Sequence, residues 1–242
     1  MDNATATVFS TVLSPRRPQD FRNLRNDWAP SAIDRRIRFT LAPMYDFVMS
    51  TNNWVLKNIV GNWNVSGTYT YQSPQYVTIQ SPTDANQNND ALDRAVINVA
   101  GKSNLSTAVT GVNRAGAVLP NGNAGIVAYV ANSPNARYVQ AGLGVFPNSG
   151  RNTFSMNPIN NVDFQALKRF NITESKRFEI GMQATNLLNH PQWSGDLLND
   201  VYPNVNNNTR SYLETGNVEF GRFDHFFTSN PRTITIVGRI VF

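Results

Sequence analysis

The 242-residue sequence contains no cysteine, and only 15% of its residues are charged. The missing cysteine excludes disulfide frameworks, thiolate metal sites and cysteine nucleophiles. The charged fraction lies below the roughly 25% of an average soluble protein, so Asn, Gln, Ser and Thr supply most of the polarity. No apolar run approaches the ~20 residues of a transmembrane helix. The first residues also lack the basic start and apolar core of a signal peptide.

The net charge of +5 has no concentrated source. Arg16 and Arg17 form one pair, Arg35, Arg36 and Arg38 form one cluster, and the other basic residues are dispersed. A Lys-rich tail or a basic helix, the usual sign of nucleic-acid binding, is missing from the sequence. We therefore expect no nucleic-acid partner.

Alternating apolar and polar residues are the main pattern that the sequence does contain. A strand has a side-chain period of two, whereas a helix would scatter these residues over every face. Each alternating segment spans about 9–12 residues, near the length of a tilted bilayer-crossing strand, whereas most soluble strands have about 5–6. The five segments are residues 37–47, 61–72, 162–170, 177–188 and 233–242.

The segments differ in quality. The cleanest is 61–72, where Trp63, Val65 and Tyr69 oppose Asn64, Ser66 and other polar residues. The weakest is 162–170. In 37–47, Pro43 removes one backbone donor, which predicts a bulge or an edge strand.

The last segment ends the chain on an aromatic residue. Ile234, Ile236, Ile240 and Phe242 share one face, with Gly238 between them. One interpretation is the edge strand of a soluble β-sandwich. The segment also resembles the C-terminal assembly signal of bacterial outer-membrane β-barrels, which implies a signal formed by Ile236, Gly238, Ile240 and Phe242. In such a barrel the apolar face meets lipid and the polar face lines the lumen.

The connections between segments alternate between short and long. Residues 171–176 and 48–60 are the shorter ones, while 73–161 and 189–232 are long. Outer-membrane barrels have short periplasmic turns and long extracellular loops, so residues 1–35 and 73–161 are predicted to be extracellular. The Asn-rich runs 86–90 and 204–208 predict solvated loop, although stretches 76–80 and 126–130 could pair as strands.

Five crossing strands cannot close a barrel, because the smallest single-chain membrane barrels have about eight. An open sheet would leave two unpaired edges, which lipid does not tolerate. We therefore expect an all-β, antiparallel transmembrane segment, with residues 1–242 as the C-terminal portion of a larger barrel.

A series of motifs points to one family. Their sequences are NLRNDW at 23–28, GNWNVSGTYTYQS at 61–73, GRNT at 150–153, NLLNHPQW at 186–193 and FGRF at 220–223. The series resembles the C-terminal end of the Oar-like TonB-dependent receptors, outer-membrane proteins with a carboxypeptidase-regulatory-like N-terminal domain. The resemblance covers most of the chain except roughly residues 80–145.

The resemblance implies a barrel of about 22 strands with an N-terminal plug and a TonB box. It also implies ligand binding and uptake at the outer surface, powered by the inner-membrane TonB complex. This chain would supply barrel wall and loops only. Its partners would be outer-membrane lipid and lipopolysaccharide, the barrel-assembly machinery, and the rest of its own barrel and plug, with the TonB complex reached only through upstream regions.

No residue pattern predicts a catalytic, cofactor or metal site, and the ligand-binding residues stay unknown. His190 and His225 are isolated, so His190 is predicted to fix the start of a loop rather than to bind metal. Asp84, Asp90 and Asp93 lack the EF-hand spacing and predict solvated loop. Arg177 and Glu179 share the lumen face and are predicted to pair with neighbours such as Arg239.

We therefore expect no enzyme. Two other functions stay open at this point. One is an outer-membrane pore or adhesin that is not energised, and the other is a secreted soluble β-sandwich that binds carbohydrate.

Overall fold

A computed structural model describes residues 18–31, 34–53, 55–89, 93–120, 122–173, 176–192, 212–222 and 231–242. Over these residues the fold is almost entirely β, with one 3-10 helix, η1 (Leu24–Asp27), and one π-helical turn, η2 (Leu56–Val60). No helix in the described ranges is long and apolar enough to cross a membrane. The chain divides into two compact units.

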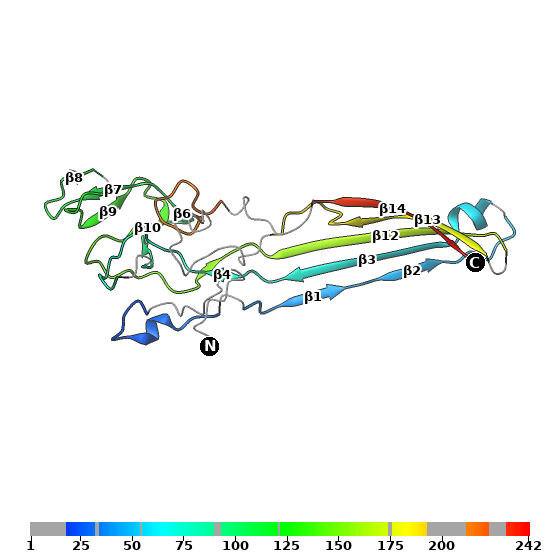
Figure 1. The fold of residues 1–242 in the computed structure, drawn as a ribbon, viewed down its shortest axis with the longest axis horizontal. Helices are drawn as coiled ribbons and strands as arrows, with labels where there is room; N and C mark the ends of the chain where they lie inside the picture. The colour runs from blue at the N-terminus through cyan, green and yellow to red at the C-terminus, as the bar shows by residue number, and fades with distance from the viewer. Residues whose placement is uncertain are drawn as a thin grey trace. The chain divides into compact units, whose positions relative to one another are not determined.

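The first unit, here called the sheet unit, comprises residues 35–73, 157–193 and 227–242. Its sheet runs in the order β1–β3–β12–β13–β14, with β2 also paired to β3, and every pair is antiparallel. The strands lie side by side in chain order (Figure 1). Their bounds are β1 Arg38–Leu41, β2 Met44–Phe47, β3 Trp63–Gln72, β12 Ile159–Asn171, β13 Arg177–Thr185 and β14 Thr233–Val241.

β1 and β2 are two halves of one edge strand, so the five predicted crossing strands are confirmed. Both halves pair with β3, and the break between them falls at Ala42 and Pro43. The backbone N–H of Gly67 still donates to the carbonyl of Pro43 at 3.0 Å. The predicted edge position of Pro43 is confirmed, since among the described residues its strand pairs only with β3. Its missing N–H lies on the β3 side and interrupts the ladder there.

The register brings the apolar residues of all five strands onto one face. Phe39 pairs with Tyr71, Tyr69 with Val162, and Ile180 with Gly238 across successive strands. The polar residues share the opposite face, as the alternation predicts.

Two residues explain why the alternation is weakest in β12. Lys168 lies on the apolar face opposite Trp63, and Leu167 lies on the polar face opposite Gly181. A Cβ at Gly181 would lie 2.8 Å from Leu167 Cδ2, so the glycine leaves room for the leucine side chain. Packing between strands thus accommodates two residues whose types do not match their faces.

The strand ends differ from the predicted bounds. β12 begins at Ile159, three residues before Val162, and β13 ends at Thr185, three residues before Leu188. β13 ends there because Asn186 adopts a φ of 50°, which an extended strand excludes.

The second unit, here called the loop unit, comprises residues 1–34, 74–156 and 194–226. It contains three small sheets, β5–β10–β6, β11–β4 and β8–β7–β9. The pairing predicted at 76–80 and 126–130 is confirmed for β4, which pairs with β11, and β9, which pairs with β7. The bounds are β4 Tyr76–Val77, β5 Val96–Ile97, β6 Ser103–Ser106, β7 Val109–Val112, β8 Val118–Leu119, β9 Ala128–Ala131, β10 Ala136–Val139 and β11 Phe154–Ser155.

The loop unit has its own core. Ile79 and Leu213 are fully buried, and the rings of Tyr138, Phe154 and Phe220 pack together with centroids 5.7–6.3 Å apart. Tyr138 and Phe154 come from the 73–161 connection and Phe220 from the 189–232 connection. The long connections therefore fold into a packed unit of their own.

Candidate functional site: the two faces of the sheet

The apolar face of the sheet is widely exposed. Ile236 is 79% exposed, Phe242 91%, and Phe39, Leu41 and other members of the face about half. In a soluble β-sandwich these side chains would form the core against a second sheet. A contiguous apolar face over five strands instead needs an apolar surrounding.

The four residues predicted as an assembly signal lie together on this face. Ile236, Gly238 and Ile240 belong to β14, and Phe242 follows it directly. β14 pairs only with β13 among the described residues, so it presents its other edge freely. Gly238 has no heavy atom within 4 Å of the position of a Cβ, so packing within the chain does not require a glycine there.

The polar face carries an ion-pair cluster near the end of the sheet where β14 ends. Glu179 is its centre and is only 2% exposed. Arg239 Nε donates to Glu179 Oε2 at 2.9 Å, and Arg177 Nε lies 3.3 Å from Oε1. The predicted pairing of Arg177, Glu179 and Arg239 is therefore confirmed.

Two members of the cluster were not predicted. Arg169 Nε lies 3.5 Å from Glu179 Oε1, and its Nη1 lies 3.0 Å from Asp46 Oδ1. Asn64 donates to the same Asp46 oxygen at 2.8 Å. The signal that could have found Arg169 is the short connection 172–176, because pairing of the strands on either side of it sets Arg169 opposite Glu179.

The cluster joins all five crossing strands and carries one surplus positive charge from three arginines and two carboxylates. A buried carboxylate needs such partners, since an isolated one is very costly. The ion pairs of the cluster link strands and stabilise the sheet. The arginine N–H groups lie on the polar side of the sheet.

A hollow of about 400 Å³ lies on the polar face beside the break between β1 and β2. Its polar lining is Ser66, Thr68, Asp163, Gln165 and Gln183. Asp163 Oδ1 accepts from Asn161 Nδ2 at 3.1 Å and from the backbone N–H of Asn186 at 2.9 Å. Hydroxyl, amide and carboxylate groups of this kind can form hydrogen bonds to a polar solute.

The NLLNHPQ stretch folds into a turn that completes the sheet where β13 has ended. Gln192 accepts the backbone N–H of Asn160 at 2.6 Å and also donates to its carbonyl. The side-chain amide thereby takes the place of a neighbouring strand for β12. Asn189 Oδ1 accepts the backbone N–H of Arg232 at 3.0 Å, which ties this turn to the start of β14.

His190 takes part in this turn through its backbone. Its N–H donates to Asn186 Oδ1 at 2.9 Å, and its carbonyl accepts from Asn186 Nδ2 at 3.1 Å. The prediction that His190 fixes a loop start is confirmed. The described residues contain no group of three His, Cys, Asp or Glu side chains placed to hold a metal ion. His225, Asp90 and the run 204–208 lie outside the described residues.

Within the loop unit, a buried polar network contradicts the solvated interpretation of Asp93. Asp93 is 3% exposed and accepts from Gln19 Nε2 at 2.7 Å and from the backbone N–H of Asn86 at 2.8 Å. Burial raises the pKa of its carboxyl above the ordinary value, while the donated hydrogen bonds lower it less. The prediction is wrong at Asp93 because a segment distant in sequence covers it.

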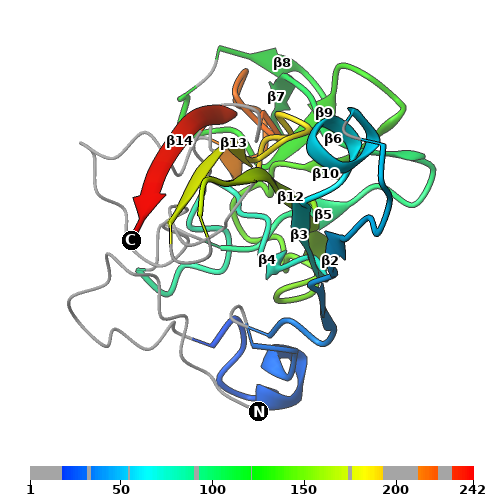
Figure 2. The same cartoon turned by 90° about the vertical axis from the view of Figure 1, so that its right-hand side faces the viewer.

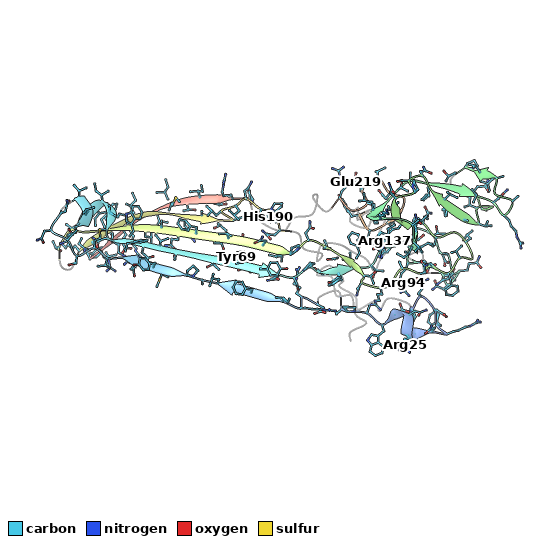
Figure 3. All side chains as sticks on the ribbon, turned by 180° about the vertical axis from the view of Figure 1, so that it is seen from behind. Arg25, Tyr69, Arg94, Arg137, His190 and Glu219 are labelled. Carbon is cyan, nitrogen blue, oxygen red and sulfur yellow. The ribbon has the colours of Figure 1, made fainter. Side chains whose placement is uncertain are left out.

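The same network joins residues 18–31 to the long connection. Arg94 Nη2 pairs with Asp27 at 3.2 Å, and Asn152 Nδ2 donates to the carbonyl of Pro30 at 2.8 Å (Figure 3 labels Arg94). Asn152 adopts a φ of 48° and also receives a hydrogen bond from Thr78. Residues of the NLRNDW, GRNT and FGRF stretches thus hold segments of the loop unit together. FGRF does so through Phe220.

Comparison with known families agrees with this geometry. The family model described as outer membrane beta barrel domain matches residues 1–235. No curated protein and no solved structure matches the chain. The matched range includes segments of both the sheet unit and the loop unit.

Proposed function

We propose that this chain, which belongs to the outer membrane β-barrel domain family, forms wall and outer loops of a TonB-dependent receptor. The family and the all-β fold place it in the bacterial outer membrane. The observation that carries the proposal is the antiparallel sheet with one exposed apolar face and one polar face. In the membrane the first faces lipid and the second faces the lumen.

The edges of the sheet support a larger barrel. Among the described residues, β1 and β2 pair only with β3, and β14 pairs only with β13. Unpaired backbone groups cost several kcal/mol each in lipid. We therefore propose that further strands close both edges, and that the lumen holds a plug, as the family resemblance implies.

The loop unit supports a role in binding at the outer surface. Its three chain segments all connect to one end of the sheet, where β3 and β13 end and β1, β12 and β14 begin. By the rule of long outer loops this end is extracellular. We propose that the loop unit contacts the ligand and that the polar face lines its path, with no catalytic step. The loop unit would then lie beside lipopolysaccharide, and the polar face of the sheet beside the plug.

Reading the genomic DNA upstream of Met1 tests the receptor assignment. An in-frame continuation that encodes a signal peptide, a TonB box and a plug would support it. An in-frame barrel without a plug would replace it by a pore or adhesin that is not energised. A stop codon and a ribosome-binding site directly before Met1 would overturn the receptor assignment.

Assembly through the last strand has its own test. We expect Phe242→Ala, in the complete protein, to reduce the amount inserted in the outer membrane, because the barrel-assembly machinery would recognise the terminal aromatic. Cell fractionation measures this, with Thr233→Ala at the other end of β14 as the matched control. Equal insertion of the Phe242→Ala and control proteins would contradict a signal at Phe242.

A further inference from the structure

We infer that the apolar side chains of η2 insert into the periplasmic leaflet of the outer membrane and anchor this end of the sheet in the lipid interface. The inference rests on the membrane orientation given under the proposed function. η2 lies at one end of the sheet, its apolar side chains are exposed, and side chains of the sheet hold its backbone.

η2 lies at the end of the sheet that carries the short connections. It joins β2 to β3, at the end where β14 also ends, as Figure 1 shows and as Figure 2 views end-on. Short connections lie on the periplasmic side of outer-membrane barrels. η2 therefore belongs at the level of the inner leaflet headgroups.

Local sequence explains why a helical turn forms here. Asn53 Oδ1 accepts the backbone N–H groups of Val55 and Leu56 at 3.0 and 3.3 Å, which caps the start of the turn. The N–H of Gly61 donates to the carbonyl of Leu56 at 2.9 Å, a bond of the π-helical type.

The apolar side chains of the turn are exposed. Val55 is 51% exposed, Leu56 40%, Ile59 58% and Val60 46%. Their spacing of one and four residues places them on one face of a helical turn, while Lys57 lies on another. Such a face, with a lysine beside it, is typical of segments that lie in a lipid interface.

Two side chains of the apolar sheet face hold the end of the turn. Trp63 Nε1 donates to the carbonyl of Ile59 at 2.9 Å. Lys168 Nζ donates to the carbonyls of Ile59, at 3.3 Å, and of Gly61. Since Trp63 and Lys168 lie on the face that meets lipid, the turn is held on the lipid side of the sheet and not on the lumen side.

This arrangement also explains a charge on the lipid-facing side. Lys168 is 4% exposed, and its Nζ lies 5.5 Å from the ring centre of Trp63 and 5.6 Å from that of Phe170. Carbonyls and ring faces together compensate an ammonium group withdrawn from water. These carbonyls of η2 accept their hydrogen bonds from protein groups, as a water-poor interface requires. The apolar face of η2 is thus continuous with the lipid-facing surface of the sheet.

Fluorescence quenching by lipid tests the inference in the complete barrel protein. Single-cysteine variants Ile59→Cys, Ile236→Cys and Asn52→Cys are labelled with an environment-sensitive fluorophore. This chain has no cysteine, and any cysteine in the rest of the complete protein is replaced beforehand. The proteins are placed in vesicles of phosphatidylethanolamine and phosphatidylglycerol doped with nitroxide-labelled phospholipid. We expect quenching at Ile59 by nitroxide near the headgroup, quenching at Ile236 by nitroxide deeper in the chains, and none at the polar control Asn52.

The outcomes separate this inference from the proposed function. Quenching at Ile236 without quenching at Ile59 would overturn the anchor and leave the membrane-facing sheet intact. Loss of quenching at both positions would overturn the orientation of the sheet itself.

A second set of variants tests the role of Lys168 as a positioning residue. Lys168→Met should abolish quenching at Ile59 while quenching at Ile236 persists, because the turn is released from the sheet. Trp63→Phe, which removes the indole donor and keeps an aromatic ring, should weaken the quenching at Ile59. This variant serves if Lys168→Met fails to assemble. Unchanged quenching at Ile59 in an assembled Lys168→Met protein would contradict the role of Lys168.

Discussion

The two units of this chain place their apolar side chains in opposite ways, one in its interior and the other on its surface. In the loop unit, Ile79 and Leu213 are 1% and 0% exposed, as in the core of a soluble domain. In the sheet unit, Ile236 and Phe242 are 79% and 91% exposed, while the carboxylate of Glu179 is buried. The difference shows that one chain is folded for two surroundings, water around the loop unit and lipid against one face of the sheet.

The units also differ in how they are held together. Backbone hydrogen bonds between neighbouring strands account for the sheet, and Glu179 reinforces it on the polar side. In the loop unit, side-chain amides connect segments far apart in the sequence, as Gln19 does with Asp93 and Asn152 with Pro30. Short strands alone could not stabilise that unit, because pairs of two to four residues contribute little.

Removal of the buried carboxylate is the largest expected break in the sheet unit. Glu179→Gln leaves three arginines without their shared partner, and we expect a loss of about 3–5 kcal/mol in the free energy of unfolding. Urea unfolding in detergent measures the loss. Asp46→Asn is the matched control, because that half-exposed pair should contribute about 0–1 kcal/mol. Equal losses in both variants would mean that Glu179 is not the centre of the cluster.

The same truncation in both units sharpens the comparison. Ile79→Ala opens a cavity in the loop unit and should cost about 2–5 kcal/mol. Ile236→Ala should cost less, because lipid chains fill the space and no cavity term arises. Opening free energies from hydrogen exchange at the amides of β10 and β13 report the two effects. A larger cost at Ile236 would indicate that protein, not lipid, covers that face.

A charge introduced on either side of β14 separates the two faces of the sheet. Ile236→Arg should cost about 2–4 kcal/mol near the bilayer midplane. Thr235→Arg, one residue away on the lumen side, should be tolerated. Unfolding of each variant in phospholipid vesicles gives the comparison. The reverse ranking would exchange the assignments of lipid face and lumen face.

The smallest expected effect concerns the pH dependence of the loop unit. Burial raises the pKa of Asp93 above 3.8, so folding favours its protonated form. Its contribution to stability is therefore fully present below pH 3.8 and is lost as the pH rises through the raised pKa. Lowering the pH from neutrality should increase hydrogen-exchange protection at Asn86 in the wild type relative to Asp93→Asn. A wild-type-to-variant ratio that does not change with pH would contradict the raised pKa.

Much of the sheet and part of the polar-face cluster could be predicted from the sequence. Alternation identified all five crossing strands, and face assignments placed Arg177, Glu179 and Arg239 together. The short connection between β12 and β13 could have added Arg169 opposite Glu179, but Asp46 could not be added. Its approach to Arg169 depends on the register between strands and not on the period within one. Lys168 could not be understood either, since the carbonyls that compensate it come from a turn more than a hundred residues away.

Local sequence is enough to assign which residues face the same side of each strand, because the side-chain period of a strand is two whatever its neighbours. It also determined where the edge strand breaks, since Pro43 has no N–H to donate. Contacts in the folded chain bury Asp93, pack the described parts of residues 74–156 with 18–31 and 212–222, and hold η2 on the lipid side of the sheet. Those outcomes depend on contacts between segments far apart in the chain, and a local pattern carries no information about which distant segment will cover it.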